Sequence, residues 1–169
     1  MVLIGLGSNQ GPSAETVPAA MRALAQFARP GTLRCSRLWQ TSPVDCPPGS
    51  NEFINAAVCF EARKELTPDA LLRSLKALEV QFGRGKKLVR NAPRELDLDL
   101  LVYDDHVRDT DIFTLPHPRA VTRLFVLAPA AEIAPDLKWP GLDKSIQELL
   151  DALETDEQAI PVADRAAGS

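Results

Sequence analysis

Leucine and aspartate alternate through residues 96–100, LDLDL, and this pattern constrains the fold more than any other in the chain. Successive side chains of a β-strand point to opposite faces, so the pattern predicts a strand with one leucine face that is buried. Asp97 and Asp99 then share the other face, with Cα atoms about 7 Å apart by the rise of a strand. Carboxylates at this spacing can share one hard cation or hold two.

A basic segment precedes this strand. Residues 84–94 contain five cationic side chains, Arg84, Lys86, Lys87, Arg90 and Arg94. A basic loop that leads into an acidic pair is typical of a site for magnesium and a polyphosphate, with metal ions between the carboxylates and the phosphates. The alternative is an amphipathic edge strand beside a solvated basic loop. The adjacency of the two features favours the phosphate site, because two aspartates on one face repel unless a positive charge lies between them.

Length, charge and cysteine content restrict the class of protein. With 169 residues the chain has the size of one domain, for which we expect residues 1–153, followed by a polar, flexible tail at 154–169. A net charge of −4 argues against general nucleic-acid binding and favours a small anionic partner. Three cysteines without CxxC spacing define no zinc site and suggest free thiols in a reducing compartment. We expect a cytoplasmic protein that does not contact membranes, since no signal peptide or transmembrane run is present. We also expect a monomer.

Hydrophobic periodicity predicts a mixture of strands and helices. The strands are expected at residues 2–6, 32–40, 53–62 and 96–103, and the helices at 13–28, 67–82, 119–128 and 145–153. Pro129 is expected to start a further turn after the third of these helices. Lys76 and Glu79, three residues apart on the second helix, are expected to form a surface ion pair.

The strand at 53–62 has two distinct faces. Its core face is expected to consist of Ile54, Ala56, Val58 and Phe60. Phe53 and Asn55 lie on the other face, where a phenyl ring could stack on a flat heterocycle while an amide binds the edge of that ring. The alternative is an ordinary core phenylalanine beside a polar residue at a strand end.

Two common nucleotide-binding motifs are absent. Gly5, Gly7 and Gly11 follow a GxGxxxG pattern instead of GxGxxG, and no regular series of strand and helix units follows. Gly85 and Lys86 lack the upstream glycine of a Walker A loop, and Lys87 stands where that loop needs Ser or Thr. If the protein binds ATP, it does so without a P-loop.

Seven segments in order resemble the 6-hydroxymethyl-7,8-dihydropterin pyrophosphokinases of folate biosynthesis, over about residues 2–137. They are IGLGSN (4–9), QTSPV (40–44), FINAAV (53–58), LEVQFGR (78–84), APRELDLDLLVY (92–103), LPHPR (115–119) and RLFVLAPAAEIAP (123–135). The resemblance implies a single-domain α+β protein with a ferredoxin-like antiparallel sheet and packed helices. It also implies a magnesium-dependent diphosphotransferase that transfers the pyrophosphoryl group of ATP to the pterin hydroxymethyl group and releases AMP.

The resemblance further implies roles for individual residues. Asp97 and Asp99 would hold two Mg²⁺ ions that bridge the ATP phosphates, and would be catalytic together with Arg84 and Arg94. The residues that contact ATP would be Glu79, Arg84, Arg90, Arg94, Leu100, His117 and Arg123. The pterin site would consist of Thr41, Pro43, Val44, Phe53, Asn55 and Phe125, with the two phenyl rings on either side of the pterin.

The chain departs from the family pattern at three positions. Asn91 occupies a position where the family often has tryptophan, so it cannot supply an aromatic lid over the pterin. Lys86 replaces a common arginine and loses the bidentate fork that grips phosphate oxygens. Lys76 stands where a glutamine is common.

Two functions from other classes compete with this one. A non-catalytic nucleotide- or RNA-binding module would need exposed aromatics on a basic face, but the chain has six Phe, two Trp and one Tyr with a negative net charge. An ordinary kinase would transfer a single phosphoryl group to a small alcohol. Only the family resemblance favours attack on the β-phosphorus over this second alternative.

Overall fold

The sheet is built around β1 (Val2–Ser8), which pairs antiparallel with β4 (Phe53–Phe60) on one side and with β5 (Asp97–Tyr103) on the other. These strands belong to a computed structural model that describes residues 1–9, 13–41, 53–83, 96–110 and 113–162. Within this part of the chain, β5 forms one edge of the sheet. The strand that carries the aspartate pair therefore has only one neighbouring strand.

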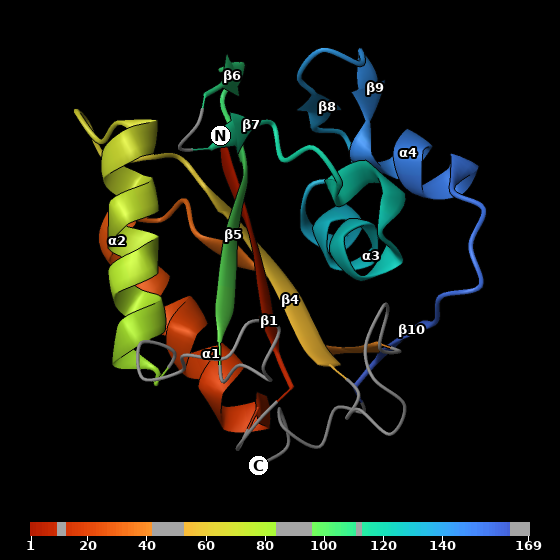
Figure 1. The fold of residues 1–169 in the computed structure, drawn as a ribbon, viewed down its shortest axis with the longest axis horizontal. Helices are drawn as coiled ribbons and strands as arrows, with labels where there is room; N and C mark the ends of the chain where they lie inside the picture. The colour runs from red at the N-terminus through yellow and green to blue at the C-terminus, as the bar shows by residue number, and fades with distance from the viewer. Residues whose placement is uncertain (10–12, 42–52, 84–95, 111–112, 163–169) are drawn as a thin grey trace.

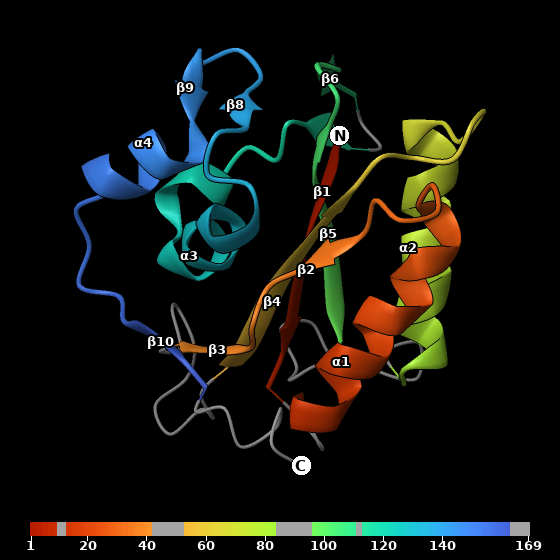
Figure 2. The same ribbon diagram turned by 180° about the vertical axis from the view of Figure 1, so that it is seen from behind.

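The sheet continues on the far side of β4. There β3 (Trp39–Thr41) pairs with the beginning of β4, and β10 (Ala159–Pro161) pairs with β3, while β2 (Arg34–Cys35) pairs with the end of β4. Figure 2 shows β10 and β3 side by side at this end of the sheet. The order of the main path is β10-β3-β4-β1-β5.

Helices cover both faces of the sheet (Figure 1). On one side lie α1 (Ser13–Leu24) and α2 (Pro68–Gln81), and on the other lie α3 (Leu124–Ile133) and α4 (Ile146–Ala152). The remaining elements are short: the 3₁₀ turns Ala25–Phe27 and Ala120–Thr122, and the hairpins of β6 (Arg108–Asp109) with β7 (Thr114–Leu115) and β8 (Lys138–Trp139) with β9 (Lys144–Ser145). None of the helices in the described ranges is both long and apolar enough to cross a bilayer.

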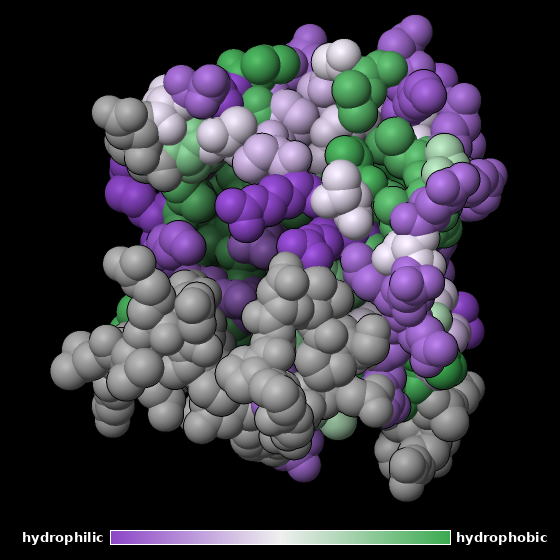
Figure 3. All heavy atoms as spheres, turned by 45° about the vertical axis from the view of Figure 1, so that its right-hand side comes forward, coloured by the Kyte–Doolittle hydropathy of each residue, from purple (hydrophilic) through white to green (hydrophobic). Residues whose placement is uncertain are grey.

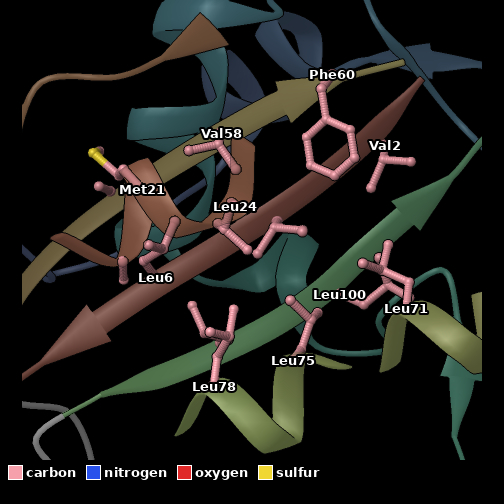
Figure 4. Close-up of a cluster of buried hydrophobic side chains, with 14 of the residues drawn as sticks. Val2, Leu6, Met21, Leu24, Val58, Phe60, Leu71, Leu75, Leu78 and Leu100 are labelled. Atoms are coloured by element: carbon pink, nitrogen blue, oxygen red, sulfur yellow. The ribbon is translucent and has the colours of Figure 1, made fainter. Parts of the chain in front are cut away.

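The first hydrophobic core fills the space between the sheet and the pair α1 and α2. The leucine face of β5 contributes Leu96, Leu98 and Leu100, at most 5% exposed, as the alternating pattern predicts. Figure 4 shows how the side chains of β1, β4, β5, α1 and α2 converge in this layer. The alternation of leucine and aspartate at 96–100 and the helical stripe of Leu71, Leu75 and Leu78 predict the residues that β5 and α2 contribute to this core.

A second core lies on the opposite face, under α3 and α4. Leu101 and Val102 both belong to it, because a register shift opposite Leu3 and Ile4 inserts one extra residue into β5. Ala57 and Cys59 of β4 are also buried there. The strand at 53–60 is therefore buried on both faces over most of its length, and only its first residues are free to line a site.

Two helix starts follow their sequence signals. The Thr67 hydroxyl accepts a hydrogen bond from the Ala70 N–H at 3.1 Å, and Pro68 begins α2. Ser145 and Glu148 form both hydrogen bonds of a capping box at the start of α4. Side-chain caps are local interactions, so the sequence specifies them well.

The prediction of one helix at 119–128 was wrong. The segment forms the 3₁₀ turn Ala120–Thr122, an extended Arg123 with φ −119° and ψ 118°, and then α3, which contains Pro129 in its interior. A proline has no N–H to donate to the carbonyl four residues earlier, which here belongs to Phe125. Burial of Leu127 and Ala130 against the sheet offsets the loss of that one bond.

Two strand predictions also need correction. The segment 32–40 is divided into β2 and β3, because the Ser36 hydroxyl accepts the Ala57 N–H at 2.9 Å in place of a backbone carbonyl. Residues 159–161, which were assigned to a flexible tail, form β10 and pair with β3. Three residues, Ala159, Ile160 and Pro161, are too few to show the two-residue period of a strand, and their partner strand is distant in sequence.

Candidate active site

Two glycines of β1 open a hollow in the face of the sheet that α3 covers. Gly7 pairs with Asn55 on one side and Asp97 on the other, and Gly5 pairs in the same way with Ala57 and Asp99. Residues that are directly opposite in a sheet point to the same face. Because neither central residue has a side chain, the backbone of β1 lines the hollow as its floor. The side chains of Asn55 and Leu101 reach close to where the Cβ atoms of Gly7 and Gly5 would stand.

This floor belongs to a cavity of about 200 Å³. Phe53 and Asn55 of β4, and Phe125 and Val126 of α3, form its walls. The face in Figure 3 is hollowed near its centre, where hydrophobic surface lies behind hydrophilic residues. An apolar recess with a few polar groups at its edge is the usual form of a site for a small flat molecule.

The Asn55 amide has two hydrogen-bond partners, and Gly7 leaves it room. Asn55 and Thr41 are 5% and 2% exposed, and their Oδ1 and Oγ1 atoms are 2.5 Å apart. On the other side, Asn55 Nδ2 lies 3.4 Å from the carbonyl oxygen of Leu6, and a Cβ added to Gly7 would lie only 2.9 Å from the same nitrogen. A buried amide held in this way presents a fixed hydrogen-bonding edge to the cavity.

Asp97 and Asp99 line the same cavity from β5. The Asp99 side chain reaches solvent, but protein surrounds it in the recess. The resulting loss of hydration is the main cause that raises the pKa of its carboxyl above the usual 3.8. The Asp97 carboxylate raises the Asp99 pKa further, His117 and Lys76 lower it, and Glu79 raises it. The charged form of Asp99 is thus disfavoured at this position, and a bound cation would favour it.

Glu79 lies behind this strand, not on the surface. It is 1% exposed, and its Oε2 accepts the Leu98 N–H at 2.8 Å, while Oε1 lies 3.5 Å from Lys76 Nζ. The prediction of a surface ion pair was therefore wrong for the glutamate. The helical spacing predicted the Lys76–Glu79 pair correctly. It could not show that the Leu98 N–H of an edge strand needs an acceptor, which the buried Glu79 carboxylate provides.

A second cavity, of about 240 Å³, lies on the other side of Asp99. Leu72 and Lys76 of α2, Leu100 of β5, and His117 line it together with Asp99. The backbone N–H of His117 donates to the Leu101 carbonyl at 2.9 Å, and the ring Nδ1 accepts the backbone N–H of Arg119 at 3.3 Å. These bonds hold both the backbone and the ring of His117. Asp99 thus borders both cavities.

The structure brings together most of the predicted site residues that it describes. The first cavity contains Thr41, Phe53, Asn55, Asp97, Asp99 and Phe125, and the second contains Leu100 and His117 with Asp99. Arg123, directly before α3, borders neither cavity, and Glu79 lies behind β5. Five predicted residues lie outside the described part of the chain: Pro43, Val44, Arg84, Arg90 and Arg94.

Four residues that line the first cavity were not among the sequence candidates: Gly5, Leu6, Gly7 and Val126. Both glycines were noted only as a poor match to a dinucleotide-binding motif. Glycine in the interior of a strand is unfavourable and often marks a place where a ligand approaches the backbone. That signal could have placed Gly5 and Gly7 in the site.

The donor set fits a hard cation. Two carboxylates on one strand face supply oxygen ligands, which magnesium prefers, and their mutual repulsion favours a positive charge between them. In the described ranges, no group of three His, Cys, Asp or Glu residues forms a complete protein cage for a metal. Magnesium is commonly held by one or two carboxylates together with substrate phosphates, so a pair is sufficient.

The fold and the site define an α+β phosphotransferase, with an antiparallel sheet that carries a carboxylate pair between two cavities. The model of the family 7,8-dihydro-6-hydroxymethylpterin-pyrophosphokinase (HPPK) matches residues 3–135. The chain belongs to this family, as the sequence segments predicted.

Curated relatives agree with this assignment. A 2-amino-4-hydroxy-6-hydroxymethyldihydropteridine pyrophosphokinase from Synechocystis sp. is 40% identical over 152 residues, which cover 90% of this chain and 75% of the relative. Proteins of the same name from Pseudomonas aeruginosa and Bacillus subtilis are 34% and 33% identical. The alignments cover 89% and 98% of this chain, and 90% and 91% of those relatives.

Solved structures support the fold. The HPPK-DHPS of Plasmodium falciparum superimposes with a TM-score of 0.67, at 13% sequence identity, over 89% of this chain and 42% of that longer chain. At such low identity the similarity concerns the architecture alone. It confirms the predicted α+β class with an antiparallel sheet and packed helices.

Proposed function

We propose that this protein transfers the pyrophosphoryl group of ATP to the hydroxymethyl group of 6-hydroxymethyl-7,8-dihydropterin, in the biosynthesis of tetrahydrofolate. The products are AMP and the pterin diphosphate. Family membership supports the reaction. The geometric observation that carries the proposal is that Asp99 borders both cavities. A reaction that joins two substrates needs such a shared boundary. We call the first of them the aromatic cavity, because Phe53 and Phe125 line it.

The aromatic cavity suits the pterin. Phe53 and Phe125 line it from β4 and α3, where they can contact the two faces of a flat ring. The Asn55 amide can donate one hydrogen bond to a ring carbonyl and accept one from the adjacent ring N–H. This pair of groups is the lactam edge of a pterin, so the ring would lie over the glycine floor with its lactam edge at Asn55.

The second cavity suits the nucleoside end of ATP. Leu72, Leu100 and Phe113 give it apolar surface, while Lys76 and His117 supply hydrogen-bond donors. The triphosphate would extend from there along β5 to Asp97 and Asp99. We assign the remaining phosphate contacts to Arg84, Arg90, Arg94 and Arg123, the roles that the family resemblance implies.

In the reaction, the hydroxymethyl oxygen attacks the β-phosphorus of ATP. A new P–O bond forms, the bond between the β-phosphorus and the bridging oxygen of the α-phosphate breaks, AMP leaves, and the hydroxyl proton passes to solvent. Phosphoryl transfer requires mainly in-line alignment and charge neutralisation, so no strong general base is needed. The two walls of the aromatic cavity hold the acceptor, and the aspartates fix the phosphate end.

Asp97 and Asp99 would hold two magnesium ions. When bound, these ions neutralise the charge on the transferred phosphates and keep the two substrates in register. The raised pKa of Asp99 supports this assignment, because a carboxylate that is buried and lies beside another one is stabilised in its charged form by a nearby cation. A monomeric state and a cytoplasmic location remain predictions from the sequence.

A metal-removal assay tests the proposal. Purified protein is incubated with ATP and the reduced pterin, and the pterin diphosphate is quantified by chromatography. We expect product only with both substrates and a divalent metal, complete loss with excess EDTA, and recovery when magnesium is added. Full turnover in EDTA would contradict the metal site. ATP consumption that does not depend on the pterin would contradict the assignment of the aromatic cavity.

A further inference from the structure

Asn55 is the only amide side chain in the lining of the aromatic cavity over the described residues, and its value as a recognition group depends on which way it is turned. An amide presents a donor on one side and an acceptor on the other, and a 180° flip exchanges them. An acceptor substrate with a lactam edge fits only one of the two orientations. Whatever fixes the flip of Asn55 therefore contributes to substrate selectivity.

The surrounding groups decide the orientation. The carbonyl of Leu6 can only accept a hydrogen bond, so the atom of Asn55 that faces it at 3.4 Å must be the Nδ2 donor. Oδ1 then faces the Thr41 hydroxyl at 2.5 Å, and the hydroxyl must donate to it. One N–H of Nδ2 and one lone pair of Oδ1 are left for a ligand.

Thr41 is well placed for this task. It ends β3, pairs with Phe53 across the sheet, and is 2% exposed, so its side chain is held in the layer that forms the cavity wall. The absence of a side chain at Gly7 leaves the amide its position, since a Cβ there would lie 2.9 Å from Nδ2. Asn55 is thus held by a hydrogen-bond donor and an acceptor, in space that Gly7 leaves free.

We infer that the Thr41 hydroxyl is a positioning group for the acceptor substrate. The Leu6 carbonyl sets the orientation of the Asn55 amide, and the Thr41 hydroxyl holds the amide in that orientation. The cavity then selects a heterocycle with adjacent C=O and N–H groups over one with adjacent amino and bare ring nitrogen groups. This inference rests on the proposed function and deepens it. The sequence resemblance gave Thr41 only a place in the pterin pocket, through the backbone of residues 41–44.

The test uses direct binding, which needs no turnover. Dissociation constants are measured without ATP for fluorescent 6-hydroxymethylpterin, which has the lactam edge, and for 2,4-diamino-6-hydroxymethylpteridine, which has an amino group in place of the ring carbonyl. The variants are Thr41→Val and Thr41→Ala, which lack the hydroxyl, and Thr41→Ser, which keeps it. Thr32→Val is the matched control, because its hydroxyl bonds the Arg29 carbonyl at 2.8 Å near the opposite end of β4.

Loss of one hydrogen bond to a buried amide should weaken binding of the lactam by about 3- to 10-fold in Thr41→Val and Thr41→Ala. Thr41→Ser and Thr32→Val should bind like the wild type. The preference for the lactam over the diamino compound should fall in the two variants without the hydroxyl. In steady-state assays the KM for the pterin should rise while the KM for ATP stays constant, which a general loss of stability would not produce.

The outcomes separate this inference from the proposed function. If the wild type binds neither compound, the assignment of the cavity to a pterin is wrong. If the wild type prefers the lactam and Thr41→Ala and Thr41→Ser behave alike in both affinity and preference, the inference about the hydroxyl is wrong. The Ala and Ser pair decides the question even if Thr41→Val fails to fold, because both lose the same β-branched methyl group.

Discussion

At the scale of single residues, the carboxylates of Asp97 and Asp99 are arranged for function at the expense of stability. Both lie on one strand face, and burial together with Asp97 raises the pKa of Asp99. A cation between them, or the loss of one charge, relieves the repulsion. Activity and stability should therefore respond in opposite directions when the charge of Asp99 is removed.

Asp99→Asn and Asp97→Asn should each lower kcat by at least about 10²- to 10³-fold, the effect of removing one electrostatic group from a polar reaction centre. The asparagine keeps the size of the side chain, so the fold should persist. Far-UV circular dichroism checks the fold, and chromatography of the pterin product measures the rate. A variant that keeps full activity would contradict the metal site.

The stability of the metal-free protein gives an independent check on Asp99. A carboxyl whose folded pKa is raised binds more protons in the folded state than in the unfolded state, so the free energy of unfolding falls as pH rises from about 3.8 through the folded pKa. Asp99→Asn should therefore have a higher Tm than the wild type at pH 7 in EDTA. The difference should vanish below pH 3.8, and magnesium should raise the Tm of the wild type more than that of the variant.

Gly7→Ala should raise the KM for the pterin, because the new methyl would meet Asn55 Nδ2 at 2.9 Å and displace the amide. A double-mutant cycle with Asn55→Ala supplies the control. If Gly7 acts only by leaving room for the amide, the double variant should have the same KM as Asn55→Ala alone. Additive effects would mean that the methyl group obstructs the substrate directly.

Residue-level chemistry could be predicted from sequence where the pattern was local. The alternation of leucine and aspartate specified both faces of one strand, and Phe53 with Asn55 followed from the same rule. The glycine floor was missed because its meaning depends on which residues flank it in neighbouring strands. That pairing, of Gly7 with Asn55 and Asp97, joins segments more than 40 residues apart.

At the scale of elements, the position of β5 at the edge of the described sheet explains the buried Glu79. The Leu98 N–H points away from β1, and the Glu79 carboxylate of α2 accepts it at 2.8 Å. One hydrogen bond thus connects a helix to the strand segment between the two aspartates. The bond holds this segment in the register that the site requires.

Glu79→Leu should lower the free energy of unfolding by about 1–3 kcal/mol, because it leaves a buried N–H without an acceptor. Glu79→Gln is the matched variant, since its amide oxygen can still accept that hydrogen bond, and it should lose clearly less. Urea denaturation of the two variants measures the difference. Equal losses would show that the negative charge, and not the acceptor, is what the strand needs.

Truncation tests the strand that the sequence assigned to a tail. Removal of all residues after Leu153 deletes β10, which pairs with Trp39–Thr41 of β3. Since Thr41 contacts Asn55, we expect a lower Tm and a higher KM for the pterin, with the KM for ATP little changed. A chain that ends at Val162 keeps β10 and serves as the control. Equal pterin KM values for the two chains would contradict a role for β10 in supporting the site.

The success of element prediction depended on how local the determining interactions are. Caps at Thr67 and Ser145 involve residues three positions apart, and both helix starts were correct. The boundary of α3 and the existence of β10 depend on packing against distant parts of the chain. Pro129 inside α3 shows that buried contacts can override a strong local signal.

At the scale of the whole molecule, the arrangement of layers creates the site. Among the described residues, α1 and α2 pack on one face of the sheet, and α3 and α4 pack on the other (Figure 1). The first cavity lies over Gly5 and Gly7 on the face of α3, where the strands provide polar groups and α3 provides Phe125. A site built on strands and a helix is held rigidly by the two cores.

We expect a pyrophosphoryl group, and not a single phosphoryl group, to pass from the nucleotide to the pterin at Asp97 and Asp99. Chromatographic identification of the nucleotide product distinguishes the two reactions. With ATP, magnesium and 6-hydroxymethyl-7,8-dihydropterin, the wild type should release AMP in a 1:1 ratio to pterin diphosphate, and Asp99→Asn should release almost none. Formation of ADP with a pterin monophosphate would contradict the account.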